Sequence, residues 1–443
     1  MGRHHPGGWT RNSLIAFASM LDRSTFLLRL SLGALLCPPS VAAANGQSTH
    51  VWISVEALER LPSGPVSDLL RRPELLTPLV NGTMFPDWGY ASGDRDHGEA
   101  SHWEPFQQEY LRWIQESFEA PYSEGEAAQH VAFLFGMASH GMADEHFDSL
   151  FMEHSRCYDT GWTLDDVASL DTASDVLFMS QVGGIATPEP WLPTEALTEV
   201  YARAMPQLPL DTEGLAWGNE LLHVAIAAVD ALKDNEERVA TFTALYPWSA
   251  ERFLDETTPG SPPTEADAVA AYWLAMWERL QGTADFDAPV ALMTPAPGSY
   301  GHALTAEKPE GRLHLAFAHG VRADTLDKIL VSTAQGAPID VEVSQFYGDL
   351  SHAVLARPLV PWEADTDYIL TIEPGLEDTN GLVSTVPWSA TFSTRTAPDP
   401  VQPGGEPPGC QYNLGPAHSS LYFAILAAFL GARRRRDSVA SSN

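Results

Sequence analysis

The chain has 443 residues, 44% of them hydrophobic, which is enough for two domains with full-sized cores. Its formal net charge at pH 7 is −33, and without residues 1–44 and 414–443 it keeps 17 basic and 56 acidic residues, a net charge of about −39. Non-specific binding to nucleic acid depends on Lys and Arg displacing counterions from phosphates. The charge therefore argues against a nucleic-acid partner.

Residues 1–44 have the composition of a targeting segment. Arg23 and Arg29 lie beside the apolar run 26–36, and Ala42-Ala43-Ala44 offers a small-residue cleavage site. We therefore predict that residues 1–44 are a signal peptide and that the protein is exported.

Residues 45–282 have helical periodicity, and alternation of period two does not compete with it. Pro, Gly and capping residues often stand at the ends of the periodic segments. The predicted helices are 55–61, 103–117, 125–154, 193–204, 214–233, 236–245 and 264–280. We expect a mainly α domain that carries the chemistry.

The stretch 129–151 has the strongest chemical signal of this region. His140, Asp144 and Asp148 follow each other at intervals of four, while apolar residues recur at spacings of three and four. Residues four apart share a helix face, and the same spacing lets paired His residues chelate zinc. A solvated polar face is the alternative. Because Phe, Met and Ala flank the stripe and an unpaired buried charge is costly, the pattern favours a metal site.

After the last predicted helix the sequence changes to short runs of period two, separated by turn signals. The predicted strands are 312–317, 329–333, 338–344, 353–356, 367–373 and 388–394. Residues 290–396 resemble bacterial Ig-like domains through Pro297-Gly298, the segments 358–361 and 368–372, and Thr-Phe-Ser-Thr at 391–394. The resemblance implies a β-sandwich that serves as a spacer or adhesive module. We expect it to be dispensable for the chemistry, because no candidate metal-binding patch lies beyond Asp175. Its scattered histidines are expected to be structural or surface residues: His302, His314, His319 and His352.

The composition of the C-terminal end predicts a linker followed by an anchor. Residues 397–413 are rich in Pro and Gly and cannot form a core. Residues 414–443 hold an apolar run, 421–432, and then four Arg residues; the run is short for a membrane helix, which needs about 20 residues. Gly409-Cys410, the run and the Arg cluster resemble the MYXO-CTERM type of sorting tag, which implies processing and anchoring at Cys410. A disordered or single-pass tail is the alternative.

Further patches of acid and imidazole beside aromatic residues are spread over the helical region. They are STHVW at 48–52, FPDWGY at 85–90, SHWEPF at 101–106 and the acidic segment DTASD at 171–175. Together with 129–151 they resemble the zinc-dependent phospholipase C family, most closely the branch that includes the N-terminal domain of glycosylphosphatidylinositol-specific phospholipase D. The resemblance covers about 45–184 at motif level. The more distant single-strand-specific zinc nucleases share the metal scheme and fold.

The resemblance implies a centre with three metal ions. The ligands of one zinc would be Asp87, His102, His140 and Asp144. Asp144 would bridge to a second zinc, held by His50 and by the amino group and carbonyl of a mature N-terminus at Asn45. Cleavage after Ala44 puts His50 five residues behind Asn45, the spacing of the phospholipase D branch.

The third site departs from the family pattern. Where the family has a His on the helix and then a His and an acid, this sequence has Asp148, Asp171 and Asp175. An all-carboxylate site suits Mg²⁺, Ca²⁺ or Mn²⁺ better than zinc. We therefore expect two or three Zn²⁺ ions, with the third site open to another divalent cation. His146 and His154 are alternative ligands, although His146 faces away from the stripe.

These features predict a secreted, surface-anchored phosphodiesterase of the phospholipase C type in the cell envelope. Closely spaced metal ions would activate water, with Asp87 as a ligand and general base by resemblance. The expected partners are a phospholipid or other phosphodiester and a membrane surface, and no protein partner is indicated. Two alternatives stay open: a zinc-dependent single-strand nuclease, and an inactive surface adhesion protein that keeps metals for stability. Four aromatic residues either line a cleft or belong to the core: Trp52, Phe85, Trp88 and Trp103.

Overall fold

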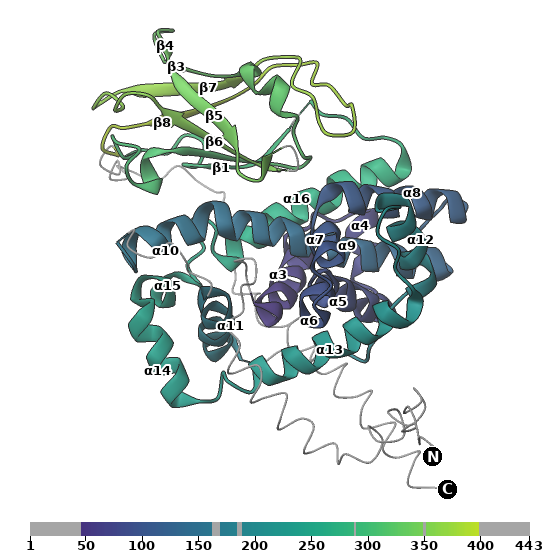
Figure 1. The fold of residues 1–443 in the computed structure, drawn as a ribbon. Helices are drawn as coiled ribbons and strands as arrows, with labels where there is room; N and C mark the ends of the chain where they lie inside the picture. Colours follow the sequence, from purple (N-terminus) through teal and green to yellow (C-terminus); the bar gives the residue numbers. More distant parts are fainter. Residues whose placement is uncertain (1–45, 162–168, 184–187, 288, 349–350, 398–443) are drawn as a thin grey trace, which may run out of the picture. The chain divides into compact units, whose positions relative to one another are not determined.

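Helices and strands occupy separate parts of the chain. The structure, a computed structural model, describes residues 46–161, 169–183, 188–287, 289–348 and 351–397, and within these the side chains of 169, 171 and 172 are not described. Helices extend to Gln281 and strands begin at Val290, so the predicted change from helical periodicity to period two after residue 282 is confirmed (Figure 1). The predicted signal peptide, Asn45, the linker after residue 397 and the tail lie outside the described residues.

The helical region contains every helix that the sequence predicted and several that it did not. The elements are α3 (Gln47–Arg60), α4 (Pro65–Leu70), η1 (Pro73–Leu75), α5 (Leu76–Met84), η2 (Phe85–Asp87), α6 (Trp88–Ser92), α7 (Arg95–His102), α8 (Glu104–Ser117), α9 (Gly125–His146), the π-helical turn η3 (Phe147–Phe151), α10 (Met152–Tyr158), α11 (Ser169–Val182), α12 (Thr194–Ala204), α13 (Thr212–Asp230), α14 (Glu236–Leu245), α15 (Pro247–Arg252) and α16 (Pro262–Gln281). α5 escaped prediction because it is buried almost all round, and such a helix has no amphipathic period. None of the described helices is long and apolar enough to cross a lipid bilayer.

α9 lies at the centre of this region and packs against α3, α5, α8 and α16 (Figure 1). Every residue from His130 to His146 is buried. At Gly136 a Cβ atom would lie 2.0 Å from the carbonyl oxygen of Leu79 on α5, so only glycine permits this close approach of the two helices. The predicted metal stripe therefore runs along the innermost helix and not along a solvated face.

The start of α3 differs from the prediction. The helix begins at Gln47 and not near residue 55. The prediction missed its first turns because they contain Ser and Thr, which are weak helix formers. The carboxylate of Asp175 on α11 accepts hydrogen bonds from the backbone N–H groups of Thr49 (2.8 Å) and Ser48 (3.4 Å). A side chain from a distant helix thus satisfies donors that the first turn leaves free.

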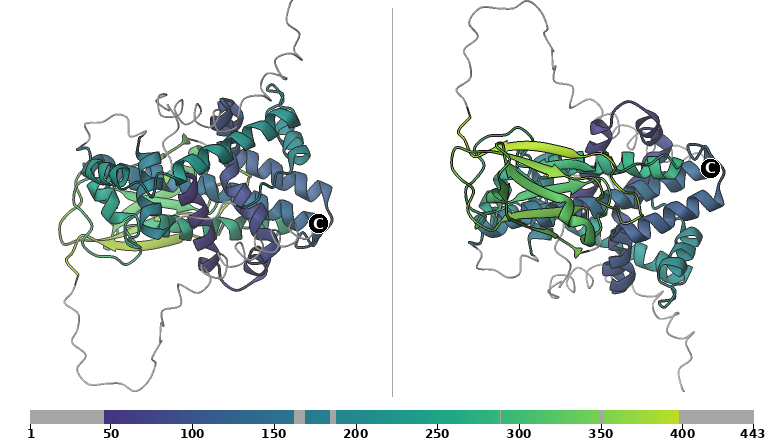
Figure 2. Two further views of the ribbon diagram at one scale, coloured as in Figure 1. Left: turned by 90° about the horizontal axis from the view of Figure 1, so that it is seen from below. Right: turned by 90° about the horizontal axis from the view of Figure 1, so that it is seen from above.

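The strands form two four-stranded antiparallel sheets, drawn in green to yellow in Figures 1 and 2. Their bounds are β1 (Val290–Thr294), β2 (Leu313–Phe317), β3 (Ile329–Thr333), β4 (Pro338–Ile339), β5 (Val341–Gln345), β6 (Ala353–Pro358), β7 (Asp367–Ile372) and β8 (Trp388–Ser393). The strand orders are β1-β2-β6-β5 and β4-β3-β7-β8. Residues of both sheets share one hydrophobic cluster, as a sandwich requires, with Leu315 and Val354 from the first sheet and Leu370 and Phe392 from the second.

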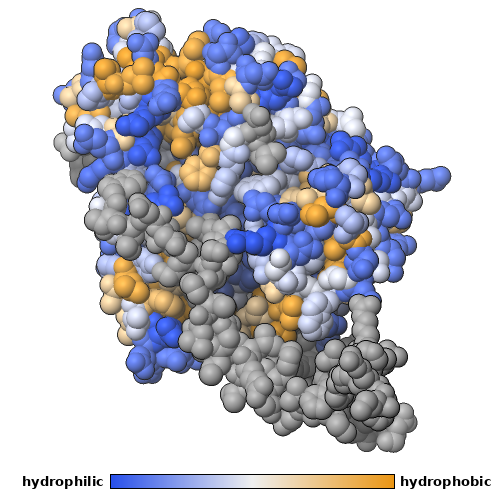
Figure 3. Space-filling view, viewed as in Figure 1, coloured by the Kyte–Doolittle hydropathy of each residue, from blue (hydrophilic) through white to orange (hydrophobic). Residues whose placement is uncertain are grey.

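Two strand predictions need correction. The predicted strand 338–344 is two strands that belong to different sheets, β4 paired with β3 and β5 paired with β6, so the chain changes sheets at Asp340. β1 was not predicted at all. Some apolar side chains stay exposed on this region, among them Leu330, Leu359 and Val360, and Figure 3 shows hydrophobic residues gathered over it.

Buried charges join the helical and β regions, which belong to one compact unit of the chain. Arg279 on α16 forms an ion pair with Glu104 on α8 and another, at 2.7 Å, with Asp378 between β7 and β8. Glu145 on α9 accepts hydrogen bonds from the backbone N–H groups of His352 (3.0 Å) and Ala353 (2.7 Å). Buried carboxylates of the helical region thus have their partners in the β region.

Candidate metal centre

Five of the predicted ligands converge inside the helical region. They come from α3, from the end of η2, from the end of α7 and from α9, and they are His50, Asp87, His102, His140 and Asp144. Their ligand atoms form two overlapping groups, each within 4.8 Å: His50, His140 and Asp144 in one, and Asp87, His102 and His140 in the other. The spacing of four in α9 and three short motifs far apart in the sequence therefore meet at one place.

Asp144 lies between the imidazoles. Its Oδ1 is 2.9 Å from Nε2 of His50, and its Oδ2 is 3.3 Å from Nε2 of His140 and 3.6 Å from Nε2 of His102. The two carboxylate oxygens thus face different imidazoles. A carboxylate that bridges two metal ions needs this arrangement.

Two of the imidazoles are oriented by backbone carbonyls. Nδ1 of His102 donates to the carbonyl oxygen of Gly98 at 2.8 Å, and Nδ1 of His140 donates to that of Thr83 at 2.7 Å. Each Nε2 atom then faces the centre and can bind a metal ion once it carries no proton, as in metal-binding histidines whose other nitrogen is held by a carbonyl.

The centre also contains buried nitrogen atoms without hydrogen-bond partners among the described residues. These are Nε2 of His140 and both ring nitrogens of His50. Both rings are fully buried and stack on each other with centroids 3.8 Å apart. Since buried polar groups normally have partners, the donor set fits a bound cation, and imidazole with carboxylate is a donor set that zinc accepts.

The electrostatics favour positive charge in the centre. Burial opposes ionisation of Asp144, but the adjacent imidazoles of His140 and His50 outweigh it and hold the pKa of Asp144 below its usual range. Burial and the neighbouring His140 lower the pKa of His50. Burial opposes protonation of His102, yet its hydrogen bond to Asp87 raises the pKa of His102 to about 9. Without a metal ion, a proton on His102 would balance the carboxylates, and a cation can replace that proton.

The close packing of α7 against α9 places His102. At Gly141 a Cβ atom would lie 1.9 Å from the carbonyl oxygen of His102, and Nε2 of Gln107 donates to that oxygen at 2.8 Å. Asp87 is the most accessible of the five candidate ligands, with 25% of its side chain exposed against at most 5% for the others. Its Oδ2 accepts a hydrogen bond from Gln47. Because Asp87 is the most exposed of the five residues, a substrate or water can reach the centre from its side.

The three carboxylates of the predicted third site have different surroundings. Asp148 is buried, and Tyr347 of the β region donates a hydrogen bond to it. Asp175 holds the start of α3, as described above, and Thr49 Oγ1 also donates to it at 2.9 Å. Asp171 lies on α11, and its side chain is not described. The third site stays a prediction, and neither Asp148 nor Asp175 belongs to the two metal groups of the described residues.

Several neighbours of the centre were left open or missed by the sequence analysis. His146 faces His314, with ring centroids 5.3 Å apart, and neither His146 nor His154 belongs to the two metal groups. Phe85 and Trp88 are buried core residues. Tyr347 was missed, because it lies 199 residues from Asp148 in a domain where no chemistry was expected.

Comparison with known proteins gives a likeness to a zinc-dependent family over part of the chain. Residues 49–229 match the model of the zinc dependent phospholipase C family, which confirms the predicted resemblance over this stretch. The chain is 27% identical over 293 residues to the phosphatidylinositol-glycan-specific phospholipase D of Mus musculus, covering 63% of this chain and 34% of that protein. It is 36% identical over 133 residues to the Bos taurus protein of the same name, covering 28% of this chain and 15% of that one. The chain thus spans about a third or less of the length of these relatives.

The solved structures that the chain resembles add no evidence on its fold or function. The S-layer protein rSbsC(31-844) has a TM-score of 0.20 and 10% identity, over 78% of this chain and 45% of that chain. A score of this size carries no argument about the fold or the function.

Proposed function

We propose that this protein is a zinc-dependent phosphodiesterase that hydrolyses phospholipids. The observation that carries the proposal is the buried centre in which three imidazoles and two carboxylates converge, with His102 and His140 oriented by backbone carbonyls. The match of residues 49–229 to the zinc dependent phospholipase C family supports the same chemistry.

Metal ions at such a centre lower the pKa of water and neutralise phosphate oxygens. The protein's own part would be positioning and proton transfer. Asp87, the most accessible carboxylate, would accept the proton of the attacking water. The oxygen of water would bond to phosphorus while the P–O bond to diacylglycerol breaks, and the released alcohol would take up a proton. This step needs no protein nucleophile.

The amino group of Asn45 would complete the site of His50. The described chain supports this, because the carbonyl oxygen of Gly46 accepts a hydrogen bond from the backbone N–H of His50 at 3.1 Å, so residue 46 lies one helical turn before His50. A protein with a few extra residues before Asn45 should lose zinc at this site, since the extension turns a coordinating amine into an amide. Unchanged zinc content and activity in the extended form would contradict this assignment.

The setting of the enzyme is part of the proposal. We infer a signal peptide over 1–44, an Ig-like module over 290–396 and a sorting tail over 414–443, which together would hold the enzyme at the cell surface near membrane substrates. The paired four-stranded sheets support the Ig-like module. Two zinc ions would occupy the imidazole-bearing sites, and a third divalent cation would bind the carboxylates Asp148, Asp171 and Asp175.

A second cleavage mode has a specific observation in its favour. The curated relatives are named phospholipases D, and such an enzyme breaks the P–O bond on the headgroup side. The products separate the modes, because C-type cleavage releases diacylglycerol and a phosphorylated headgroup, whereas D-type cleavage releases phosphatidic acid and the free headgroup.

The test is a substrate panel for the purified zinc-loaded protein: phosphatidylcholine, phosphatidylinositol and single-stranded DNA, each with and without a chelator. We expect chelator-sensitive hydrolysis of a phospholipid, and a loss of about a hundredfold or more in kcat for Asp87→Asn. Cleavage of DNA but of neither lipid would favour the nuclease. Zinc retained without any hydrolysis would favour the adhesion protein.

A further inference from the structure

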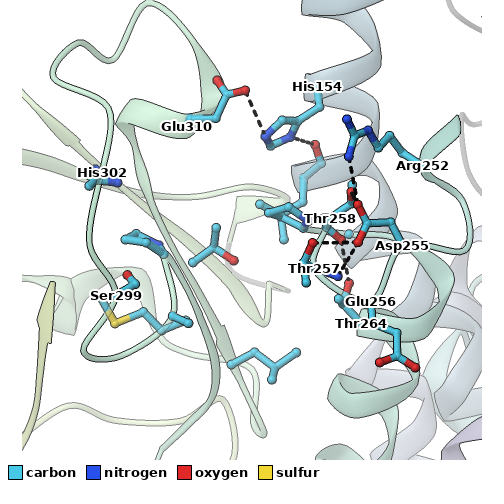
Figure 4. A pocket seen from close by; sticks show the side chains of 18 of the residues that line it. His154, Arg252, Asp255, Glu256, Thr257, Thr258, Thr264, Ser299, His302 and Glu310 are labelled. Carbon is cyan, nitrogen blue, oxygen red and sulfur yellow. Dashed lines mark hydrogen bonds and ion pairs between the residues drawn. The ribbon is translucent and has the colours of Figure 1, made fainter. Parts of the chain in front are cut away.

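A cavity outside the metal centre lies where the helical region meets the β region. It has a volume of about 1010 Å³ and is lined by residues of α9, η3, α10, α15 and the start of α16, and by β1 and the segment that follows it. Figure 4 shows His302, Ser299 and Glu310 of the β region on one side and His154, Arg252 and Asp255 of the helical region on the other. A volume of this size accommodates a small organic ligand.

This cavity is separate from the metal centre, although the same helix serves both. His140, Asp144 and Asp148 lie on one stripe of α9 and η3, whereas His146 begins a second stripe, with Leu150 and His154 at intervals of four. The second stripe lines the cavity, and the first does not. Residues two apart on a helix point to nearly opposite sides, so Asp144 and His146 face different sites.

One wall of the cavity is aromatic. The ring of His154 stacks on Trp248 with centroids 5.7 Å apart and planes at 9°, and Tyr158 stacks on Trp248 at 5.6 Å and 24°. Tyr158 is 39% exposed, and Trp248 is half-buried. Lys308 lies over the Tyr158 ring, with its Nζ 5.3 Å from the ring centroid. These rings give the cavity an aromatic lining, of which Tyr158 is the most exposed part.

The β side of the cavity holds polar atoms without partners among the described residues. These are Oγ of Ser299, Nε2 of His302 and Oε2 of Glu310. His302 is only 7% exposed and is one of the lining residues, and its ring packs on Trp362 and Phe392. The other oxygen of Glu310 is already used, because Tyr158 donates to it. Buried polar atoms of this kind normally have partners, and here a ligand that enters the cavity would supply them.

We propose that this cavity binds a pyranose sugar. A sugar ring has an apolar C–H face that can stack on Trp248 and Tyr158, and hydroxyl groups around its edge that can pair with Ser299, His302 and Glu310. The lining charges include both signs, Arg252 and Lys308 against acidic residues such as Asp255, which suits a neutral ligand with many hydroxyls. A polyanion is disfavoured by the acidic surface of the whole chain. The proposal goes beyond the phosphodiesterase activity and does not depend on it.

The test uses the full chain with methyl α-D-glucopyranoside, methyl α-D-mannopyranoside, N-acetyl-D-glucosamine and maltotriose as probes. Saturation-transfer NMR and calorimetry should show saturable binding of at least one probe, with a dissociation constant on the order of millimolar or tighter. Trp248→Ala and Glu310→Gln should each weaken that binding about tenfold or more. Trp217→Ala is the matched control, since Trp217 is 52% exposed and does not line the cavity.

Glu310→Gln keeps the shape of the side chain and changes the unpartnered oxygen, so it tests the site even if Trp248→Ala folds poorly. Thermal denaturation would show whether each variant is folded. Saturable binding that Glu310→Gln weakens and Trp217→Ala leaves unchanged supports the proposal. The absence of binding by all four probes, or equal binding by wild type and a folded Glu310→Gln protein, overturns it.

Discussion

The histidines of the candidate metal centre are as buried as His314 and His319, which lie where the β region meets the helical region. The two sets differ in whether their ring nitrogens have hydrogen-bond partners. At the centre, His140 has one nitrogen held by the Thr83 carbonyl and the other without a partner among the described residues. At the contact, Nε2 of His314 lies 2.8 Å from Oγ of Ser149, and Nδ1 of His319 lies 2.9 Å from Asp378. Burial alone therefore does not mark a metal ligand, whereas an unpartnered nitrogen beside carboxylates does.

The largest effect should come from the ligand that both metal groups share. His140→Ala removes an imidazole from each group, so zinc content should fall and activity should drop by more than about a hundredfold. Elemental analysis after dialysis and a lipid-hydrolysis assay would measure this. His314→Gln is the counterpart at the contact and should keep all of the zinc; if it loses as much zinc as His140→Ala, the distinction between the two kinds of histidine is wrong.

A large effect on stability, without loss of zinc, is expected where charges join the two regions. Arg279→Met leaves Glu104 and Asp378 buried without their common cation, which should lower the free energy of unfolding by about 3–5 kcal/mol. Chemical denaturation would measure it. Arg252→Met, which breaks a surface pair with Asp255, should cost less than about 1 kcal/mol. Similar costs for both variants would show that the buried network does not hold the regions together.

The pH dependence of stability should reveal the lowered pKa of His302, a buried histidine of the β region. Burial lowers the pKa of His302 to about 4 in the folded protein, against 6.5 in the unfolded chain. Between these values the unfolded chain binds more protons, so stability should fall as the pH falls from about 6.5 to 4, by at most about 3 kcal/mol from this group. His302→Gln should flatten this part of the stability profile. An identical profile for wild type and variant would show that His302 titrates normally.

The smallest effects should appear at the predicted third site, where carboxylates also have protein partners. Wild-type protein dialysed against zinc-free buffer should keep about two zinc ions, as counted from its imidazole-bearing sites. Asp175→Ala should leave those ions in place and change only weakly held metal. Because Asp175 also satisfies the first turn of α3, the variant should lose about 1 kcal/mol of stability.

Tyr347→Phe is a companion variant for the same site. It removes the hydroxyl that donates to Asp148 and keeps the ring, which packs 4.7 Å from Trp103. Zinc content should stay the same, and stability should fall by about 1–3 kcal/mol because Asp148 loses its partner. Three equally inert zinc ions in the wild type, or none, would mean that these carboxylates are misassigned.

The contact between the two regions also changes what is expected of the β region. The sequence showed no chemistry there, so it was expected to be dispensable for the reaction. The structure places Tyr347 on Asp148 and pairs Glu145, the neighbour of Asp144, with backbone groups of the β region. Since these contacts lie beside the metal centre, we now expect removal of the β region to lower stability and to disturb the surroundings of Asp148.

The sequence by itself determined most of the main elements and the candidate donor set. Helical periodicity gave the main helices, alternation gave most strands, and the spacing of His140 and Asp144 with the motifs around His50, Asp87 and His102 gave the ligands that converge. These features could be read because each is local, set by a helical or strand period or by a short motif.

Only the tertiary structure decided which groups form hydrogen bonds with the buried polar side chains. Asp175 satisfies α3 from 126 residues away, Tyr347 reaches Asp148 across 199 residues, and the cavity of His302 and Trp248 exists only where two regions meet. No sequence period records such contacts. The reason is that a buried polar group requires a partner without specifying where in the chain that partner lies, and packing of the whole chain settles the choice.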